Sequence, residues 1–256
     1  MERRVATVAE VWRYPVKSMA GERLPSATTG PAGIEGDRAF GVIDGATGKV
    51  LSAKTVPLLL SVAAAWSAGS VRFAGSPFDG ASSDDHDIHV RLSEWLEREV
   101  RLERPNEGTR TPFDLPLDPD RPEELFELLT PPGSFFDSRS TLHLLSDASL
   151  RSAARDHPAG DWDPRRFRAN VFIHSDADGF PEEDWVGASV RIGSLETGVR
   201  KPAARCVLTT QAQPGLPRDV EIFRSLARNR SGNLGIYLDA RTEGVVAEGD
   251  TVEILS

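Results

Sequence analysis

Short apolar segments separated by Gly, Pro or Asp most constrain what this 256-residue chain can fold into. Their apolar residues recur at short period, which is typical of β-strands and differs from the spacing along an amphipathic helix. A succession of such segments predicts a mainly β protein. The expected strands cover residues 5–12, 39–44, 60–66, 141–145, 168–174, 188–192, 206–210, 234–238 and 251–255.

Helical spacing is confined to three stretches, at residues 88–99, 147–156 and 219–230. The second of them follows Ser146, whose hydroxyl is a candidate N-cap. Three helices are too few to alternate with the expected strands, as a doubly wound fold would require. The fold class predicted is therefore mainly β (α+β), with a few short helices.

A division of the chain is expected between residues 105 and 132. Seven of the 18 prolines lie there together with several acidic residues, and this composition breaks both helices and β-ladders. We therefore expect an N-terminal domain at residues 1–120 and a second domain at residues 121–256. Both are expected to be built on strongly bent antiparallel sheets.

Composition excludes several classes of protein. The 30 Lys and Arg against 39 Asp and Glu give a net charge of −9, which opposes generic binding to nucleic acid or to an anionic membrane. One cysteine excludes a disulfide scaffold and an all-cysteine zinc or iron–sulfur site within the chain. The N-terminus lacks an apolar signal region, and no apolar stretch approaches the ~20 residues of a membrane helix. We expect a cytoplasmic protein.

The only cysteine, Cys206, follows a local cluster of positive charge. Arg200, Lys201 and Arg205 precede it within six residues. Nearby cations lower the pKa of a thiol and favour the thiolate, which attacks electrophiles and binds soft metals. The alternative is a small buried side chain at the start of a strand.

Two further regions are candidates for binding an anion. Residues 165–168 place three arginines just before Asn170, and guanidinium groups suit phosphate or carboxylate. An exposed basic turn paired with nearby aspartates explains that cluster equally well. The Gly-rich turns at residues 14–21 and 33–38 present Lys, Ser and Arg together, although solvated turns would look the same. The chain has no HExxH pair, dinucleotide fingerprint, Walker A loop or GxSxG motif.

Six short motifs follow one another along the chain. They are Tyr14-Pro-Val-Lys-Ser18, Gly36-Asp-Arg38, Phe167-Arg-Ala-Asn170, Phe180-Pro-Glu-Glu-Asp-Trp185, Arg205-Cys-Val-Leu-Thr-Thr210 and Gly249-Asp250. Taken in this order they resemble the MOSC family, which is named after the C-terminal domain of molybdenum cofactor sulfurase. The resemblance covers about residues 5–255. It implies an N-terminal MOSC-type β-barrel domain followed by a MOSC β-barrel domain.

Within that family the layout is most similar to the mitochondrial amidoxime reducing component and its bacterial relatives. Those proteins bind molybdenum cofactor (molybdopterin) and reduce N-hydroxylated compounds. The resemblance implies that Cys206 ligates molybdenum and is the catalytic residue. An anionic cofactor of this kind needs converging cations. The residues implied to contact it are Lys17, Ser18, Arg38, Arg168, Asn170 and Tyr237, together with Ser140 from the loosely matching stretch 138–140.

Two functions are consistent with this pattern. The first is a molybdenum-dependent oxidoreductase that reduces small N-hydroxylated substrates with electrons from a separate electron-transfer protein, since one cysteine cannot hold an iron–sulfur cluster. The second is a carrier that delivers sulfur, as a Cys206 persulfide, or the cofactor itself. Pyridoxal phosphate would then be needed only in a partner desulfurase. The sequence departs from the amidoxime-reducing branch at Ala204, where that branch has a small hydroxyl residue. A structural β protein with a core cysteine is a third interpretation.

Overall fold

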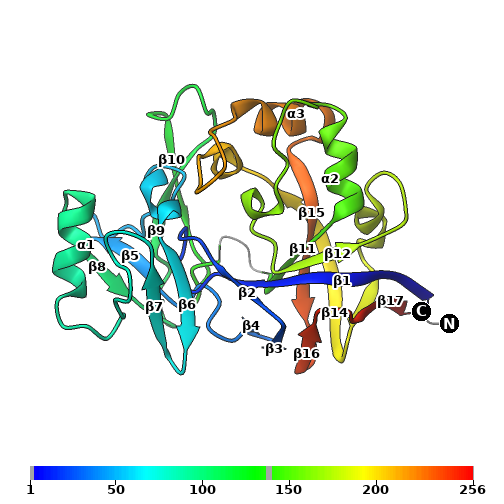
Figure 1. Cartoon of the computed structure of the whole chain (residues 1–256), viewed down its shortest axis with the longest axis horizontal. Coiled ribbons are helices and arrows are strands. Elements are labelled where there is room, and N and C mark those ends of the chain that lie inside the picture. Colours follow the sequence, from blue (N-terminus) through cyan, green and yellow to red (C-terminus); the bar gives the residue numbers. More distant parts are fainter. Residues whose placement is uncertain (1–2, 137–139, 256) are drawn as a thin grey trace.

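In the computed structural model, residues 3–136 and 140–255 are described, and they confirm the mainly β prediction (Figure 1). Three α-helices lie in these ranges, close to the expected positions. The first packs with the sheets of the N-terminal half, at the end of the molecule opposite both termini in Figure 1, and the other two pack beside the barrel described next. They are α1 (Ile88–Leu96), α2 (Asp147–Ala154) and α3 (Val220–Arg230).

Seven strands close into a β-barrel. Their order around the barrel is β12-β11-β15-β14-β13-β17-β1, and pairing of β1 with β12 completes the ring. Closure removes the exposed sheet edges at which chains otherwise aggregate. The strands are β1 (Arg3–Arg13), β11 (Leu142–Ser146), β12 (Val171–His174), β13 (Ser189–Ile192), β14 (Leu195–Ala204), β15 (Asn233–Ala240) and β17 (Thr251–Leu255).

The barrel encloses one of the hydrophobic cores. Val190 and Ile192 alternate along β13, and Leu142 and Leu144 alternate along β11, so that their side chains reach the same interior. The first strand, β1, pairs with β17 as well as β12 although it lies at the opposite end of the sequence. Strand β1 is therefore part of the barrel, although in the sequence it precedes the domain division expected near residue 120.

The N-terminal half packs around a second core from short sheets and α1. Val42, Leu60 and Phe78 are among its fully buried residues. A three-stranded sheet made of β16, β3 and β4 draws one strand from the C-terminal part and packs on the barrel core instead, through Ala27, Ile34 and Val246. The strands of this region are β2 (Glu22–Leu24), β3 (Ser26–Gly30), β4 (Gly33–Ile34), β5 (Gly41–Asp44), β6 (Ala63–Ser67), β7 (Ser70–Ala74), β8 (Val100–Glu103) and β16 (Gly244–Ala247).

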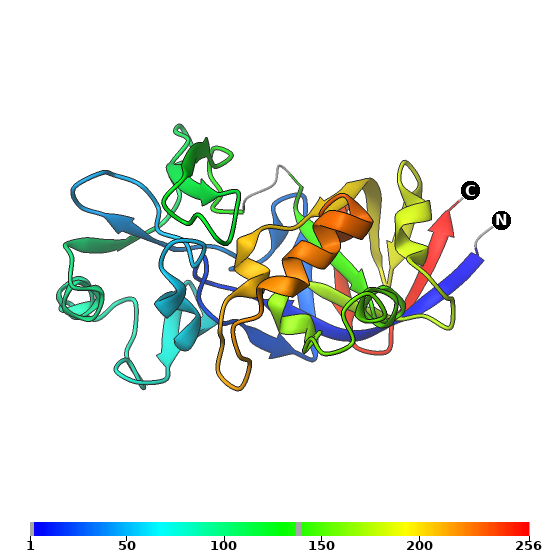
Figure 2. The ribbon, with the colours of Figure 1, turned by 90° about the horizontal axis from the view of Figure 1, so that it is seen from above.

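The proline-rich stretch 105–132 contains a regular β-ladder, which the sequence analysis did not predict. Strands β9 (Pro112–Pro116) and β10 (Leu125–Leu129) pair in antiparallel register over five residue pairs. Prolines stand at the two ends of β9 and in the connecting turn, where a missing N–H donor does little harm to the ladder. We call this hairpin the β9–β10 ribbon, and it projects from the body of the molecule in Figure 2.

The strand expected at residues 206–210 is wrong. Residues Val207–Thr210 form a 3₁₀ helix, η4. The hydroxyl of Thr209 donates to the Cys206 carbonyl at 3.0 Å, and the hydroxyl of Thr210 donates to the Val207 carbonyl at 2.7 Å. Such local bonds from threonine compete with ladder pairing, and here they favour a turn. The strand of this region is β14, which ends just before the cysteine.

The strand expected at residues 60–66 begins later than predicted, as β6 at Ala63, and Pro57–Ser61 form a 3₁₀ helix. The N-cap predicted at Ser146 is confirmed. The Ser146 hydroxyl oxygen accepts from the backbone N–H of Ser149 at 3.0 Å, which is the N-cap expected for α2. Asp219 caps α3 in the same manner through Glu221 N–H at 3.0 Å. No helix within the described ranges combines the length and the apolar character needed to cross a membrane.

Candidate functional site

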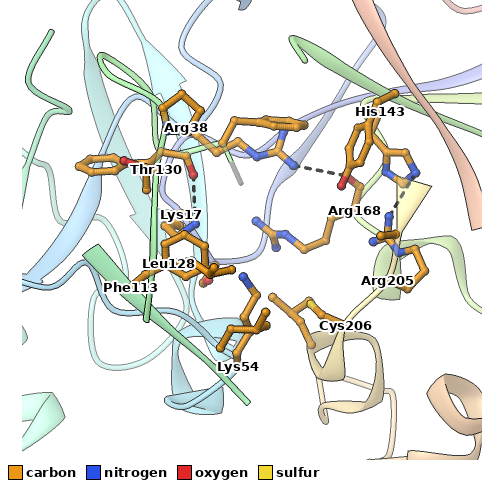
Figure 3. A pocket seen from close by; sticks show the side chains of 18 of the residues that line it. Lys17, Arg38, Lys54, Phe113, Leu128, Thr130, His143, Arg168, Arg205 and Cys206 are labelled. Carbon is orange, nitrogen blue, oxygen red and sulfur yellow. Dashed lines mark hydrogen bonds between the residues drawn. The ribbon is translucent and has the colours of Figure 1, made fainter. Parts of the chain in front are cut away.

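A cavity of about 510 Å³ lies between the N-terminal half and the barrel. Its size is within the range of small-molecule sites. Its walls come from widely separated parts of the chain: the turns after β1, the β9–β10 ribbon, the start of β11, the segment before β12 and the end of β14 (Figure 3). The two halves of the chain therefore build one site together.

Positive charge dominates the cavity wall, although the chain as a whole carries a net charge of −9. No aspartate or glutamate occurs among the described residues that line it. A concave surface with converging cations concentrates anions. The eight basic residues of the lining are Lys17, Arg38, Lys54, Arg110, Arg168, Arg200, Lys201 and Arg205.

Cys206 lies on the wall of this cavity, at the point where β14 ends and η4 begins. Its side chain is partly buried and forms no disulfide. Figure 3 shows Cys206, Lys54 and Arg168 extending into the same space. The thiol is thus accessible to a ligand in the cavity, and it faces cations from both halves of the molecule.

Two of the predicted arginines stack on Tyr14. The guanidinium carbons of Arg38 and Arg168 lie 4.6 Å and 4.2 Å from the centre of its ring. Arg38 also lies 4.6 Å from the ring of Phe136 and donates to the Arg168 carbonyl at 3.3 Å. An ion pair with Asp37 holds its other side. Stacking on an aromatic ring fixes the plane of a guanidinium group without using its N–H donors.

Tyr14 itself stays neutral at physiological pH. Burial raises the pKa of Tyr14 to about 12, against the opposing effect of Arg168 and Arg38. Its hydroxyl donates to the Ala169 carbonyl at 3.4 Å. The ring therefore serves as an uncharged platform between two cations.

The backbone is strained at three of the predicted site residues. Ser18, Arg38 and Arg168 have φ values of 68°, 50° and 55°. L-residues other than glycine rarely adopt this left-handed region, and such residues cluster at functional sites where the surrounding structure enforces them. All three line the cavity. The strain therefore accompanies the placement of these side chains on the cavity wall.

Lys17 and Lys54 bring positive charge from the N-terminal half. Both are almost fully buried, with 4% and 5% exposure. The Lys17 ammonium donates to the Phe135 carbonyl at 3.1 Å and lies 4.9 Å from the ring centre of Phe113. The Lys54 ammonium lies 4.5 Å from that ring. The sequence analysis missed Lys54, because a lysine after a short apolar segment carries no distinguishing motif.

Two predicted residues lie outside the cavity lining. Asn170 is fully buried, and its side-chain amide donates to the Trp12 carbonyl at 3.2 Å while its oxygen accepts from His143 N–H at 3.2 Å. It ties β1 to β11, so it supports the wall rather than facing a ligand. Ser140 is buried and also absent from the lining. Ser138 and Arg139 lie outside the described residues.

His143 is a site residue that sequence reasoning did not find. It lines the cavity beside Tyr237, with ring centres 5.5 Å apart. Its Nε2 lies 3.3 Å from an Arg205 guanidinium nitrogen, which can only donate, so this Nε2 accepts. Burial, with the added effect of Arg205 and Arg38, holds the pKa of His143 well below its usual value. The imidazole is therefore neutral. The sequence pattern placed His143 in a strand, and nothing in that pattern indicated that its side chain lines a cavity.

The basic cluster at residues 165–168 divides into three roles. Arg165 pairs with Asp163 at 2.8 Å, as the basic-turn alternative required. Arg166 is fully buried and donates to carbonyls of the segment that follows Cys206. Only Arg168 lines the cavity, and it donates to the Met19 carbonyl at 2.7 Å. One arginine of the three therefore faces the cavity.

The acidic motif at residues 180–185 has a structural role. Glu182 is fully buried and accepts from the hydroxyl of Ser146 at 2.6 Å and from its backbone N–H at 3.1 Å. Burial raises the pKa of Glu182 above its usual value. The carboxyl thereby fixes the start of α2 against the short helix η3 (Pro181–Trp185).

Comparison with known families and structures agrees with this architecture. Residues 5–104 match the MOSC N-terminal beta barrel domain, and residues 132–253 match the MOSC domain. The chain belongs to the MOSC-domain family. These two domains occur in the expected order and span most of the chain, including all eight basic residues of the cavity except Arg110.

Individual relatives are distant. The molybdenum cofactor sulfurase of Drosophila grimshawi is 24% identical over 280 residues, covering 94% of this chain and 34% of that protein. This MOSC-domain chain thus spans about a third of its relative's length. The crystal structure of the YUAD protein from Bacillus subtilis aligns with a TM-score of 0.51 at 14% identity, covering 99% of this chain and 98% of that one. It shares the fold. The family and the relative support a function related to the molybdenum cofactor.

Proposed function

We propose that this MOSC-domain protein binds molybdenum cofactor in the cavity and reduces N-hydroxylated compounds. The observation that carries the proposal is the lining itself, in which eight basic side chains surround the only thiol of an acidic chain. The cofactor is an anionic pterin with a phosphate and a sulfur-ligated metal, so it requires cations and favours a soft ligand. The residues present fit that chemistry.

In this proposal the two stacked arginines, Arg38 and Arg168, bind the anionic parts of the cofactor, with Lys17, Ser18 and Lys54 contributing from the N-terminal half. Cys206 provides the protein's ligand to the metal, in its deprotonated form. No group of three or more His, Cys, Asp or Glu in residues 3–136 and 140–255 is placed to hold a metal ion. The remaining metal ligands are therefore assigned to the cofactor.

When bound, the cofactor would supply two-electron redox chemistry. Reduction of an N–O bond consumes two electrons and two protons and releases water, so the atoms and charges balance. The electrons come from a separate donor protein. The cations of the wall hold the substrate's oxygen-bearing end near Cys206. The neutral His143 adds no further positive charge, and Arg205 donates to its Nε2.

The decisive experiment measures molybdenum by elemental mass spectrometry and pterin by fluorescence, on protein from a host that makes the cofactor. We expect near-stoichiometric amounts of both in the wild type. Cys206→Ala should lose metal while retaining pterin, whereas Arg38→Met should lose both. Arg101→Met is the control, because Arg101 is exposed on β8 and does not line the cavity.

The second half of the test supplies electrons chemically to the loaded protein and follows loss of an N-hydroxylated amidine. Turnover that depends on Cys206 supports the proposal. Loaded protein that leaves every N-hydroxylated compound unchanged would refute the reductase function while retaining cofactor binding. Absence of both metal and pterin from the wild type would refute cofactor binding.

One observation favours a second function. The Drosophila grimshawi relative is a molybdenum cofactor sulfurase, which suggests a carrier in which Cys206 holds a persulfide for delivery. Incubation with a desulfurase and free cysteine should then add the mass of one sulfur atom to wild-type protein and not to Cys206→Ala. An unmodified wild-type mass would argue against the carrier.

A further inference from the structure

The β9–β10 ribbon presents one wholly apolar face. Paired residues of antiparallel strands point to the same side, as do residues two apart along a strand. The register pairs Phe113 with Leu128 and Leu115 with Phe126. These four side chains therefore share one face of the ribbon. Leu125, at the far end of β10, lies on the opposite face.

This apolar face continues into the cavity. Phe113, Leu115 and Leu128 line it together with the cations, and the ammonium groups of Lys17 and Lys54 lie 4.9 Å and 4.5 Å from the Phe113 ring centre. Leu128 is 43% exposed and Phe126 is 54% exposed, although leucine and phenylalanine on a paired strand normally find apolar cover. The ribbon thus adds an apolar wall surface beside the cations of the cavity, and this apolar surface extends beyond the cavity as Phe126.

Ion pairs at the middle of the ladder and at the tip of the ribbon hold this wall in place. On the opposite face, the Lys49 ammonium pairs with Asp114 at 2.7 Å and with Glu127 at 3.0 Å. At the tip, Asp120 pairs with Arg224 of α3, on the barrel side of the molecule. The ribbon is therefore connected to both halves, and its apolar face is fixed in front of the cations.

We infer that the ribbon's apolar face binds the apolar substituent of the substrate. The substrate class is an amphipathic N-hydroxylated compound with an aryl or extended alkyl group beside the N–O function. Its polar end faces the cations near Cys206, and its apolar end covers Leu115 and Leu128. This inference rests on the proposed function and specifies the substrate of the same site.

The first test compares two N-hydroxylated amidines, one with a phenyl substituent and one with a methyl substituent. Leu128→Ser should lower the phenyl-to-methyl ratio of kcat/KM by about tenfold, since one apolar contact of this size in a substrate pocket is worth at least that factor. A ratio equal to that of the wild type overturns the inference.

Leu125→Ser provides the matched control. Leu125 is on the same strand with 45% exposure, close to that of Leu128, but it lies on the other face and does not line the cavity. A ribbon that merely loses stability on gaining a serine would respond equally to both substitutions. Binding through the apolar face responds only to Leu128→Ser, and equal responses refute it.

A binding measurement separates failure of this inference from failure of the proposed function. Titration calorimetry with acetate and with phenylpropanoate requires no turnover, because a carboxylate engages the cations directly. Wild type and Leu125→Ser should bind phenylpropanoate more tightly than acetate, and Leu128→Ser should lose that preference. Preference in all three proteins, or in none, would refute the apolar wall even if N–O reduction is confirmed. If no amidine is reduced but Leu128→Ser alone loses the preference for phenylpropanoate, binding by the apolar face is supported and the reductase function is refuted.

Discussion

Replacing Arg166 tests how the segment carrying Cys206 is held in place. The Arg166 guanidinium is fully buried and donates to the carbonyls of Asp161 at 2.8 Å, Gln211 at 3.2 Å and Pro217 at 2.7 Å. A fourth contact, to Thr209, is longer at 3.5 Å. The bonds to Gln211 and Pro217 hold the segment that follows η4 in place. Arg166→Met preserves apolar bulk and leaves the carbonyls without a donor.

The expected magnitude follows from those bonds. A hydrogen bond from a charged donor contributes about 1.5 kcal/mol at the low end of its range, so loss of three costs about 4–5 kcal/mol. Relief of the buried charge offsets part of this, because burial lowers the pKa of Arg166 and so disfavours its charged form. We expect the free energy of unfolding to fall by about 3–4 kcal/mol, a large part of the roughly 5–15 kcal/mol of a typical protein.

Urea denaturation followed by tryptophan fluorescence measures the loss, since Trp162 stacks on Phe167 next to this arginine. Arg165→Met is the control, because Arg165 is two-fifths exposed and its ion pair with Asp163 should contribute less than about 1 kcal/mol. Hydrogen exchange should also accelerate in residues 206–217 of the Arg166 variant. If the two variants unfold within about 1 kcal/mol of each other, or exchange in 206–217 is unchanged, the anchoring role of Arg166 is refuted.

Three other predictions concern pH and backbone strain. Because burial raises the pKa of Glu182, its contribution to stability is lost as pH rises from the usual carboxyl range through the raised pKa. The Tm of Glu182→Gln should therefore rise relative to that of the wild type as pH increases from about 4 to about 8. A Tm difference that does not depend on pH would contradict this. The pKa of His143 is lowered, so its contribution is lost as pH falls below its usual value. The Tm of His143→Gln should accordingly rise relative to that of the wild type as pH falls from about 7 to about 5. A constant Tm difference would contradict this. Gly235 has φ +79°, and a Cβ there would lie 2.6 Å from the Leu144 carbonyl oxygen. Gly235→Ala should lower the free energy of unfolding, measured by denaturation, by about 2–4 kcal/mol. Gly48→Ala should lower it by only about 1–2 kcal/mol, because Gly48 also has a positive φ but an added Cβ there would meet no atom within 4 Å. Similar losses in the two variants would contradict the clash at Gly235.

Local patterns in the sequence were sufficient for many elements. Alternating apolar residues predicted β1, β13 and β17, and the Ser146 cap predicted the start of α2. These succeed because strand and helix periods, and capping bonds, depend on near neighbours in the chain. The 3₁₀ helix after Cys206 was missed because two threonine hydroxyls bond locally there and replace a ladder.

The candidate site divides in the same way. Motif resemblance pointed to Lys17, Arg38, Arg168 and Cys206, and all four line one cavity. Resemblance also pointed to Asn170, whose amide is instead occupied by backbone groups of two barrel strands. A motif marks a position, but it does not say whether that side chain faces a ligand or the strand beside it.

The sequence by itself determined the β-rich character, the two-domain MOSC architecture and the cationic segments around a single thiol. Tertiary structure alone decided which cations share a wall, since Lys54 and Arg205 are far apart in the chain and meet only when the two halves pack together. It also decided that a proline-rich stretch becomes an apolar ribbon facing those cations. The physical reason is that periodicity and capping are local interactions, whereas a cavity wall is set by packing between residues that the sequence places far apart.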